Sequence, residues 1–227
     1  MKIRILVAAL IVACCAAFSH ATVIMTGDPV ALSELIDGSV TISSGDKTFE
    51  NWGYLHTGDA PDASDINVVP ITDNVTGDLG IRFQGGFQDI PDPSANSSDS
   101  LISYTVRAPG NLIEGAILQA NGSVLGGTDL QRFAGVTETF LGSSAEAEGK
   151  KLDVYDNGTI FVPKDSMSLI TPVSYLDVQK DIILNAGTDG AAAVLSFVDQ
   201  LYPQVPEPSS IALLMFGLVG LAARRRR

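Results

Sequence analysis

Residues 151–162 read Lys-Leu-Asp-Val-Tyr-Asp-Asn-Gly-Thr-Ile-Phe-Val, and this stretch decides which class of fold the chain adopts. Apolar and polar side chains alternate over 151–154, which is the period of a β-strand with one buried face, and 159–162 is a short run rich in β-branched and aromatic residues, which is also typical of a strand. Between them, Asn157-Gly158 is a dipeptide that readily adopts the positive φ angles of a type I′ turn. The stretch therefore predicts an antiparallel hairpin closed by a tight turn.

The same two-residue period recurs along most of the chain. It predicts strands over 48–55, 66–72, 79–87, 101–107, 112–119, 136–141, 176–184 and 191–201. The last of these also fits a helix face, and we assign it as a strand. Short strands separated by Gly, Asn and Asp turns predict an all-β domain, an antiparallel β-sandwich of the jelly-roll type. The long helical crossovers of a parallel α/β fold are absent from the pattern.

Three local signals refine this pattern. The aromatic strand 48–55 is predicted to contain a bulge. Pro70 lacks an N–H group for a sheet ladder, so its strand is expected at a sheet edge. One short helix is predicted over 29–37, because Asp28-Pro29 is typical of a helix start and Gly38 of a helix end.

The chain begins with a segment typical of a secretory signal peptide. Two basic residues precede an apolar run over 5–17, and Ser19-His20-Ala21 is a small-x-small cleavage site. This pattern predicts that signal peptidase removes residues 1–21 and leaves one β-sandwich domain over 22–204. An alternative is a lipoprotein signal, since Ile11-Val12-Ala13-Cys14 fits a permissive lipobox and would leave an acylated Cys14.

Both cysteines of the chain, Cys14 and Cys15, lie inside this N-terminal segment. After ordinary signal-peptide cleavage the mature domain would contain no cysteine. Disulfides, thiolate metal sites and cysteine nucleophiles would then be excluded, and the domain must be held by its core.

The C-terminal segment 205–227 carries a membrane signal. Residues 211–223 contain no charge and would form a helix about 20 Å long. Ser209 and Ser210, together with snorkelling arginines, extend this to a short single transmembrane helix. Positive charge stays on the cytoplasmic side, which places the domain outside the membrane. The four residues that act as the membrane stop are Arg224, Arg225, Arg226 and Arg227.

The tail consists, in order, of a proline-glutamate-proline motif, an apolar helix and an arginine cluster. This arrangement resembles the PEP-CTERM sorting signal of exported proteins of Gram-negative bacteria. The motif residues are Pro206, Glu207 and Pro208. The segments 32–35 and 45–54 also resemble the opening of a domain common in such proteins, one that implies no activity. The resemblance implies recognition and cleavage by an exosortase, a transient inner-membrane anchor, and a final place at the cell surface or outside the cell.

Charge and motif content exclude several function classes. Residues 22–206 contain 8 Lys plus Arg and 25 Asp plus Glu, a net charge of -17, so nucleic acid is not expected as a partner. His56 is the only histidine after the signal peptide, which excludes a multi-histidine metal site. No Gly-x-Ser-x-Gly elbow, phosphate loop or dinucleotide fingerprint occurs. We therefore predict that the protein is not an enzyme and needs no cofactor.

Two acidic features remain as candidates. Asp59, Asp62 and Asp65 bring three oxygen ligands into one loop, which is a weak calcium signal beside the simpler interpretation of a solvated loop. Glu138 shares a strand face with Val136 and Phe140, which would direct it into the core. Because buried carboxylates are rare, we expect an edge or bulge to turn Glu138 to solvent.

Two classes of function follow. The first is a non-catalytic cell-surface or extracellular-matrix protein that is sorted by its tail. The alternative is a carbohydrate-binding module or carbohydrate-active enzyme on the same sandwich, with Trp52 or Tyr54 as a platform for an extracellular polysaccharide. Burial of these aromatics, or two carboxylates converging in a groove, would discriminate between them.

Overall fold

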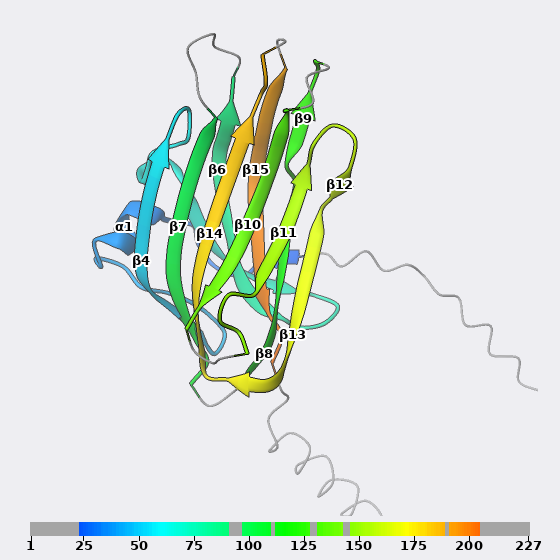
Figure 1. The fold of residues 1–227 in the computed structure, drawn as a ribbon. Helices are drawn as coiled ribbons and strands as arrows, with labels where there is room; N and C mark the ends of the chain where they lie inside the picture. Colours follow the sequence, from blue (N-terminus) through cyan, green and yellow to red (C-terminus); the bar gives the residue numbers. More distant parts are fainter. Residues whose placement is uncertain are drawn as a thin grey trace, which may run out of the picture.

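The computed structural model describes residues 23–90, 97–109, 112–127, 131–142, 146–188 and 191–204, which form two antiparallel β-sheets packed face to face (Figure 1). The predicted all-β sandwich is confirmed. The predicted signal peptide and the tail 205–227 lie outside the described residues. Within the described ranges, no helix has the length and apolar character needed to cross a membrane.

One sheet has eight strands among the described residues. Its order is β1-β5-β6-β15-β8-β13, with β2 also paired to β5 and β9 to β15. The strands are β1 (Val23–Met25), β2 (Val30–Ala31), β5 (Asn67–Asp73), β6 (Leu79–Asp89), β8 (Ile113–Ala120), β9 (Ser123–Leu125), β13 (Lys164–Val173) and β15 (Ala192–Tyr202).

The second sheet has seven strands in the described part of the chain, in the order β12-β11-β10-β14-β7-β4-β3. The strands are β3 (Ile42–Ser44), β4 (Lys47–Thr57), β7 (Ser98–Arg107), β10 (Phe133–Leu141), β11 (Lys151–Asp156), β12 (Phe161–Val162) and β14 (Tyr175–Asn185). Two short helices, α1 (Leu32–Ile36) and η1 (Ala63–Asp65), accompany the strands.

Alternate residues of both sheets meet in one apolar core. Ile81 and Phe83 of β6 face Ile102, Tyr104 and Val106 of β7, and all five side chains are buried. This is the period-two pattern of the sequence, with one face of each sheet turned inward. The ambiguous segment 191–201 belongs to β15, so its assignment as a strand is confirmed.

The predicted bulge in the aromatic strand is also confirmed. The register between β4 and β7 shifts between Glu50 and Gly53, and Asn51 within it has φ = 59°. The bulge turns Trp52 toward the core, where its ring stacks on Tyr104 with centroids 5.0 Å apart.

The predicted helix forms, but its predicted bounds were wrong. Helix α1 covers Leu32–Ile36 rather than 29–37, and its N-cap is Ala31 rather than Asp28. Val30 and Ala31 instead pair with Val68 and Asn67 of β5. The tertiary pairing with β5 overrides the local start signal.

Pro70 does not mark a sheet edge, so that prediction was wrong. Strand β5 pairs with β6 on one side and with β1 and β2 on the other. The Thr26 N–H donates to the Pro70 carbonyl oxygen at 2.8 Å, so the backbone of Pro70 faces the segment 26–29 between β1 and β2. The missing N–H therefore removes no hydrogen bond to β6.

The hairpin at 151–162 forms, but its turn is not type I′. Tyr155 pairs with Val162 and Asp156 with Phe161, which leaves residues 157–160 as a loop. Gly158 has φ = 77°, and the Asn157 side chain accepts hydrogen bonds from the N–H groups of Thr159 and Ile160. The side chain of Asn157 thus stabilises a longer loop instead of a two-residue turn.

Candidate functional site

Three polar side chains meet in the centre of the sandwich. Glu138 on β10 lies directly opposite Lys180 on β14, and Gln200 reaches them from β15 in the other sheet. All three residues are 0% exposed. The Lys180 Nζ group donates hydrogen bonds to Oε2 of Glu138 and, at 2.9 Å, to Oε1 of Gln200. We call Glu138, Lys180 and Gln200 the core triad.

Two tyrosines close this polar region. The hydroxyl groups of Tyr104 and Tyr202 lie 2.7 Å apart and share a hydrogen bond. Burial, and then the charge of Glu138, raises the pKa of Tyr104 well above its ordinary value, and burial likewise raises the pKa of Tyr202. Both phenols therefore stay neutral and act only as hydrogen-bonding groups.

Burial also controls the ionisation of the core triad. It raises the pKa of Glu138 and lowers the pKa of Lys180, against the attraction between the two. Each shift disfavours the charged form, so the ion pair and its neutral, proton-transferred form are brought closer in free energy.

The expectation that Glu138 turns to solvent was wrong. Strand β10 lies between β11 and β14, so Glu138 is at neither an edge nor a bulge. Lys180 compensates its charge from the neighbouring strand. The sequence signal for such a partner is weak: Lys180 lies between Val178 and Ile182 on the apolar face of its strand, a position where a lysine is unexpected.

A second acidic feature lies on the outer face of the seven-stranded sheet. Asp181 of β14 lies near Asp99 of the paired strand β7, close enough for Asp99 to raise its pKa. Asp99 also lines a groove of about 390 Å³, together with Leu55, His56, Thr57 and Leu101. Two carboxyl groups thus converge beside a groove, a feature that residue spacing did not reveal because the two aspartates are 82 positions apart.

Asp181 makes the stability of the fold depend on pH. Burial, and then the hydrogen bond and charge of Asp99, raises the pKa of Asp181 from 3.8 to about 6. The folded state therefore holds this proton more tightly than the unfolded chain does. The stabilisation from this proton is complete below pH 3.8, the pKa of the aspartate in the unfolded chain. It is lost as the pH rises through about 6, the pKa of Asp181 in the folded state.

We expect Asp181→Asn to flatten this part of the stability profile. The fall in the free energy of unfolding between about pH 4 and pH 6 should shrink by about 1 kcal/mol, a small value because the pair is partly solvated. Urea denaturation at several pH values measures it. The exposed Asp28, replaced by asparagine, is the control and should leave the profile unchanged. Parallel profiles for the Asp181 variant and the parent would contradict the prediction.

The predicted calcium ligands occupy separate contacts. Asp59 Oδ2 accepts the Ile90 N–H at 3.3 Å, and Asp62 Oδ1 lies 3.4 Å from Nε2 of His56. The Asp65 N–H donates to the Asp62 carbonyl oxygen within η1. Among the described residues, no three His, Cys, Asp or Glu side chains are grouped so that they could hold a metal ion. Calcium binding by Asp59, Asp62 and Asp65 stays a prediction without support from this arrangement.

The two candidate sugar platforms are occupied by the protein itself. Trp52 packs in the core against Tyr104 and Phe83. The Tyr54 hydroxyl donates to the Pro61 carbonyl oxygen at 2.6 Å, and its ring stacks on His56 with centroids 5.2 Å apart. Both side chains are half-buried, and these contacts within the protein compete with the stacking of a sugar on either ring.

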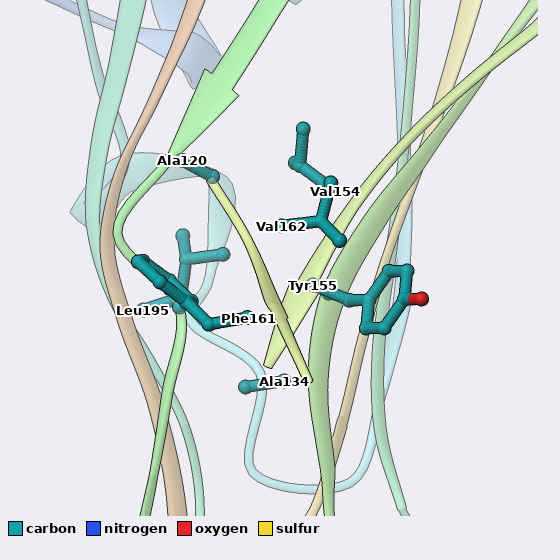
Figure 2. A pocket seen from close by; sticks show the side chains of 9 residues that line it. Ala120, Ala134, Val154, Tyr155, Phe161, Val162 and Leu195 are labelled. Atoms are coloured by element: carbon teal, nitrogen blue, oxygen red, sulfur yellow. The ribbon is translucent and has the colours of Figure 1, made fainter. Parts of the chain in front are cut away.

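A crevice also opens between the sheets near β12 (Figure 2). Its lining includes Leu195 of β15 and Phe161 of β12, and Figure 2 shows the Tyr155 ring pointing away from it. The crevice has no room for a water-sized molecule, so it cannot hold a ligand in this conformation.

Two solved structures resemble this chain at low similarity. TmCBM61 in complex with beta-1,4-galactotriose is 12% identical over 66% of this chain and 88% of that chain, with a TM-score of 0.29. The enzymatically active domain of tailspike protein 4 from bacteriophage CBA120 is 12% identical over 65% of this chain and 19% of that chain, with a TM-score of 0.27. Neither likeness is close enough to indicate a ligand. No curated protein matches the chain.

The C-terminal end of the sandwich leads directly into the predicted sorting tail. Gln204 forms a bridge with Ile113, and its side-chain oxygen accepts a hydrogen bond from the buried Lys47. Residues 204–227 match the family model of the PEP-CTERM protein-sorting motif, which implies export and recognition by an exosortase. The resemblance seen in the sequence is thereby confirmed: the chain carries a C-terminal PEP-CTERM sorting motif that begins where its β-sandwich ends.

Proposed function

We propose that this protein is a non-catalytic component of the bacterial cell surface or extracellular matrix, and that an exosortase cleaves it at its tail. The observation that carries the proposal is the sorting motif at 204–227, placed two residues after the last strand ends at Tyr202. Signal peptidase would remove residues 1–21. The sandwich would then lie outside the inner membrane, with the terminal arginines in the cytoplasm until cleavage.

The arrangement of acidic groups supports a non-catalytic role. Retaining glycosidases hold two carboxyl groups about 5 to 5.5 Å apart, and inverting ones hold them farther apart, to accommodate a sugar and a water. Asp99 and Asp181 instead interact with each other, and this interaction helps to raise the pKa of Asp181 to about 6. Their mutual interaction favours a structural pair over two carboxyl groups held apart around a sugar.

The strand order supports a jelly roll as the finer description of the fold. Eight strands correspond to a jelly roll. Four of them lie in one sheet in the order β6-β15-β8-β13, and four lie in the other sheet in the order β7-β14-β10-β11. Successive strands of this set mostly cross from one sheet to the other, as two nested Greek keys require. The remaining short strands, with β4 and β5, extend the sheets.

The test of the sorting role is Glu207→Ala in a host that contains an exosortase. We expect the full-length, membrane-bound form to accumulate, with an unchanged melting temperature of the sandwich. The reason is that Glu207 lies between two prolines. The ring of Pro208 sterically disfavours a helical conformation at Glu207, which favours an extended backbone that a protease cleft can bind. Membrane fractionation and mass spectrometry for peptides from 211–227 measure processing.

Ser210→Ala is the matched control for this test, because it changes the same segment outside the proline-glutamate-proline motif. It should be processed like the parent chain. Release of the Glu207 variant from the membrane at the parental rate would reject a sorting role for this residue.

A second candidate function is binding of an extracellular polysaccharide at the outer-face groove. Leu55 is 70% exposed there, and Asp99 adds hydrogen-bond acceptors beside it. An apolar surface next to a few polar groups is the usual composition of a small-ligand site. A glycan array probed with the protein, with and without Ca²⁺, decides between a binding module and a purely structural domain.

A further inference from the structure

The core of the sandwich holds a lysine amine against a side-chain amide. Lys180 and Gln200 belong to different sheets, and Nζ lies 2.9 Å from Oε1 of Gln200. A C=O bond is about 1.2 Å long, so Nζ is at most about 4.1 Å from the amide carbon. Reacting atoms in near-attack arrangements are about 3 to 3.5 Å apart. A small movement of either side chain would bring the nitrogen into contact with the carbon.

The third member of the core triad supplies a proton carrier. Glu138 is bound to the same Nζ atom, and both side chains are 0% exposed. Burial favours the neutral forms of both groups, that is, a free amine on Lys180 and a carboxylic acid on Glu138. A neutral buried amine is a nucleophile, and a neighbouring carboxyl group can carry protons for it.

We propose that Lys180 and Gln200 form an intramolecular isopeptide bond that joins the two sheets, with Glu138 as the proton carrier. The lone pair of Nζ forms a bond to Cδ of Gln200, and the C=O electrons move to Oε1. One Nζ proton passes through the Glu138 carboxyl group to Nε2, the Cδ–Nε2 bond breaks and the carbonyl re-forms. An amine and a primary amide become a secondary amide and ammonia, so no oxidant, reductant or co-reactant is needed.

Two unpaired atoms in the core triad fit this reaction. Among the described residues, Nε2 of Gln200 and Oε1 of Glu138 are buried without a hydrogen-bond partner. Buried polar atoms of this kind are rare in folded proteins. The reaction removes Nε2 as ammonia and uses the carboxyl group of Glu138 for proton transfer.

The isopeptide bond would give the domain a covalent link between its two sheets. The two cysteines of the chain lie at positions 14 and 15, so the described domain has no disulfide to join its sheets. The bond would link β14 to β15 across the core and close the segment 180–200 into a covalent loop. Closing a loop restricts the unfolded chain and raises stability in the same way as a disulfide of similar span.

The test is the mass of the full chain, purified from cells and measured under denaturing conditions. We expect most molecules to be lighter by about 17 Da than the mass calculated for the sequence between their own first and last residues, because ammonia is lost when the lysine amine attacks the amide. Chymotrypsin cleaves after residues such as Phe197, between positions 180 and 200. The digest should contain one joined species that carries both Lys180 and Gln200.

Gln200→Met removes the amide while preserving the Glu138–Lys180 pair, and it should restore the full sequence mass. Glu138→Gln preserves the shape of the proton carrier without its acidity and should also show the unmodified mass. Asn121-Gly122 and Asn157-Gly158 could lose ammonia as succinimides, and that loss would persist in the Gln200 variant.

Wild-type protein with its full sequence mass would overturn the proposal, and this outcome does not depend on whether any variant folds. A loss of ammonia that persists in Gln200→Met would also overturn it. A loss of about 18 Da, one water, would place the amide on Glu138 instead of Gln200 and reject the assignment.

Discussion

Replacing Glu138 with leucine is expected to lower the free energy of unfolding by about 3 to 5 kcal/mol relative to molecules in which Lys180 and Gln200 are not joined, because removing one member of a buried ion pair leaves the other uncompensated. Lys180 is 0% exposed, and among the described residues its remaining hydrogen-bond partner would be the amide oxygen of Gln200. The amine would then have to stay neutral in the core or draw water into it.

The double variant Glu138→Leu/Lys180→Met provides the control. Both replacements keep the approximate volume and remove both charges, so the double variant should be clearly more stable than the single variant, although both lack the covalent bond of the parent chain. Neither variant can form an isopeptide bond through the proposed route, so their difference isolates the unpaired charge. Urea denaturation at neutral pH measures it. A single variant as stable as the double one would show that the charge of Lys180 is not buried as described.

Gly80→Ala is expected to destabilise the protein by about 3 kcal/mol or more, at or above the upper end of the usual range for overpacking. Gly80 of β6 pairs with Leu201 of β15, and a Cβ atom at position 80 would lie 1.8 Å from the carbonyl oxygen of Gln200. This obstacle is backbone and cannot rotate away. The two strands would have to separate at a place where both are paired.

Gly86→Ala in the same strand is the matched control. A Cβ atom at position 86 would meet nothing within 4 Å, and this glycine has no positive φ. Its replacement should leave stability unchanged or raise it slightly, because alanine restricts the unfolded chain. Thermal unfolding of both variants compares the two sites. Equal melting temperatures would contradict the close approach of β6 to β15.

Local patterns predicted the strands well because each strand has one buried face. Ile102, Tyr104 and Val106 alternate with polar residues, and β7 contains them as predicted. The bulge in β4 was also visible, since aromatic residues at 49, 52 and 54 break the two-residue period. These features depend on neighbours in the sequence, and a two-residue period needs no partner strand to be recognised.

The predictions that failed depended on partners distant in the sequence. Pro70 indicated a sheet edge. Two separate short strands pair with β5 along this side, β1 with the residues after Pro70 and β2 with the residues before it. Glu138 was expected in solvent because its partner, Lys180, is 42 positions away. No local signal tells a buried carboxylate with a counter-charge from an exposed one.

The sequence by itself determined the all-β class, the positions of most strands and the C-terminal sorting motif, because each of these depends on residues that are contiguous in the chain. Only the tertiary structure decided which side chains meet. The core triad draws on β10, β14 and β15, and the Asp99–Asp181 pair draws on β7 and β14. The physical reason is that strand order and register are fixed by the packing of the whole sandwich, and both sites exist only once that order is set.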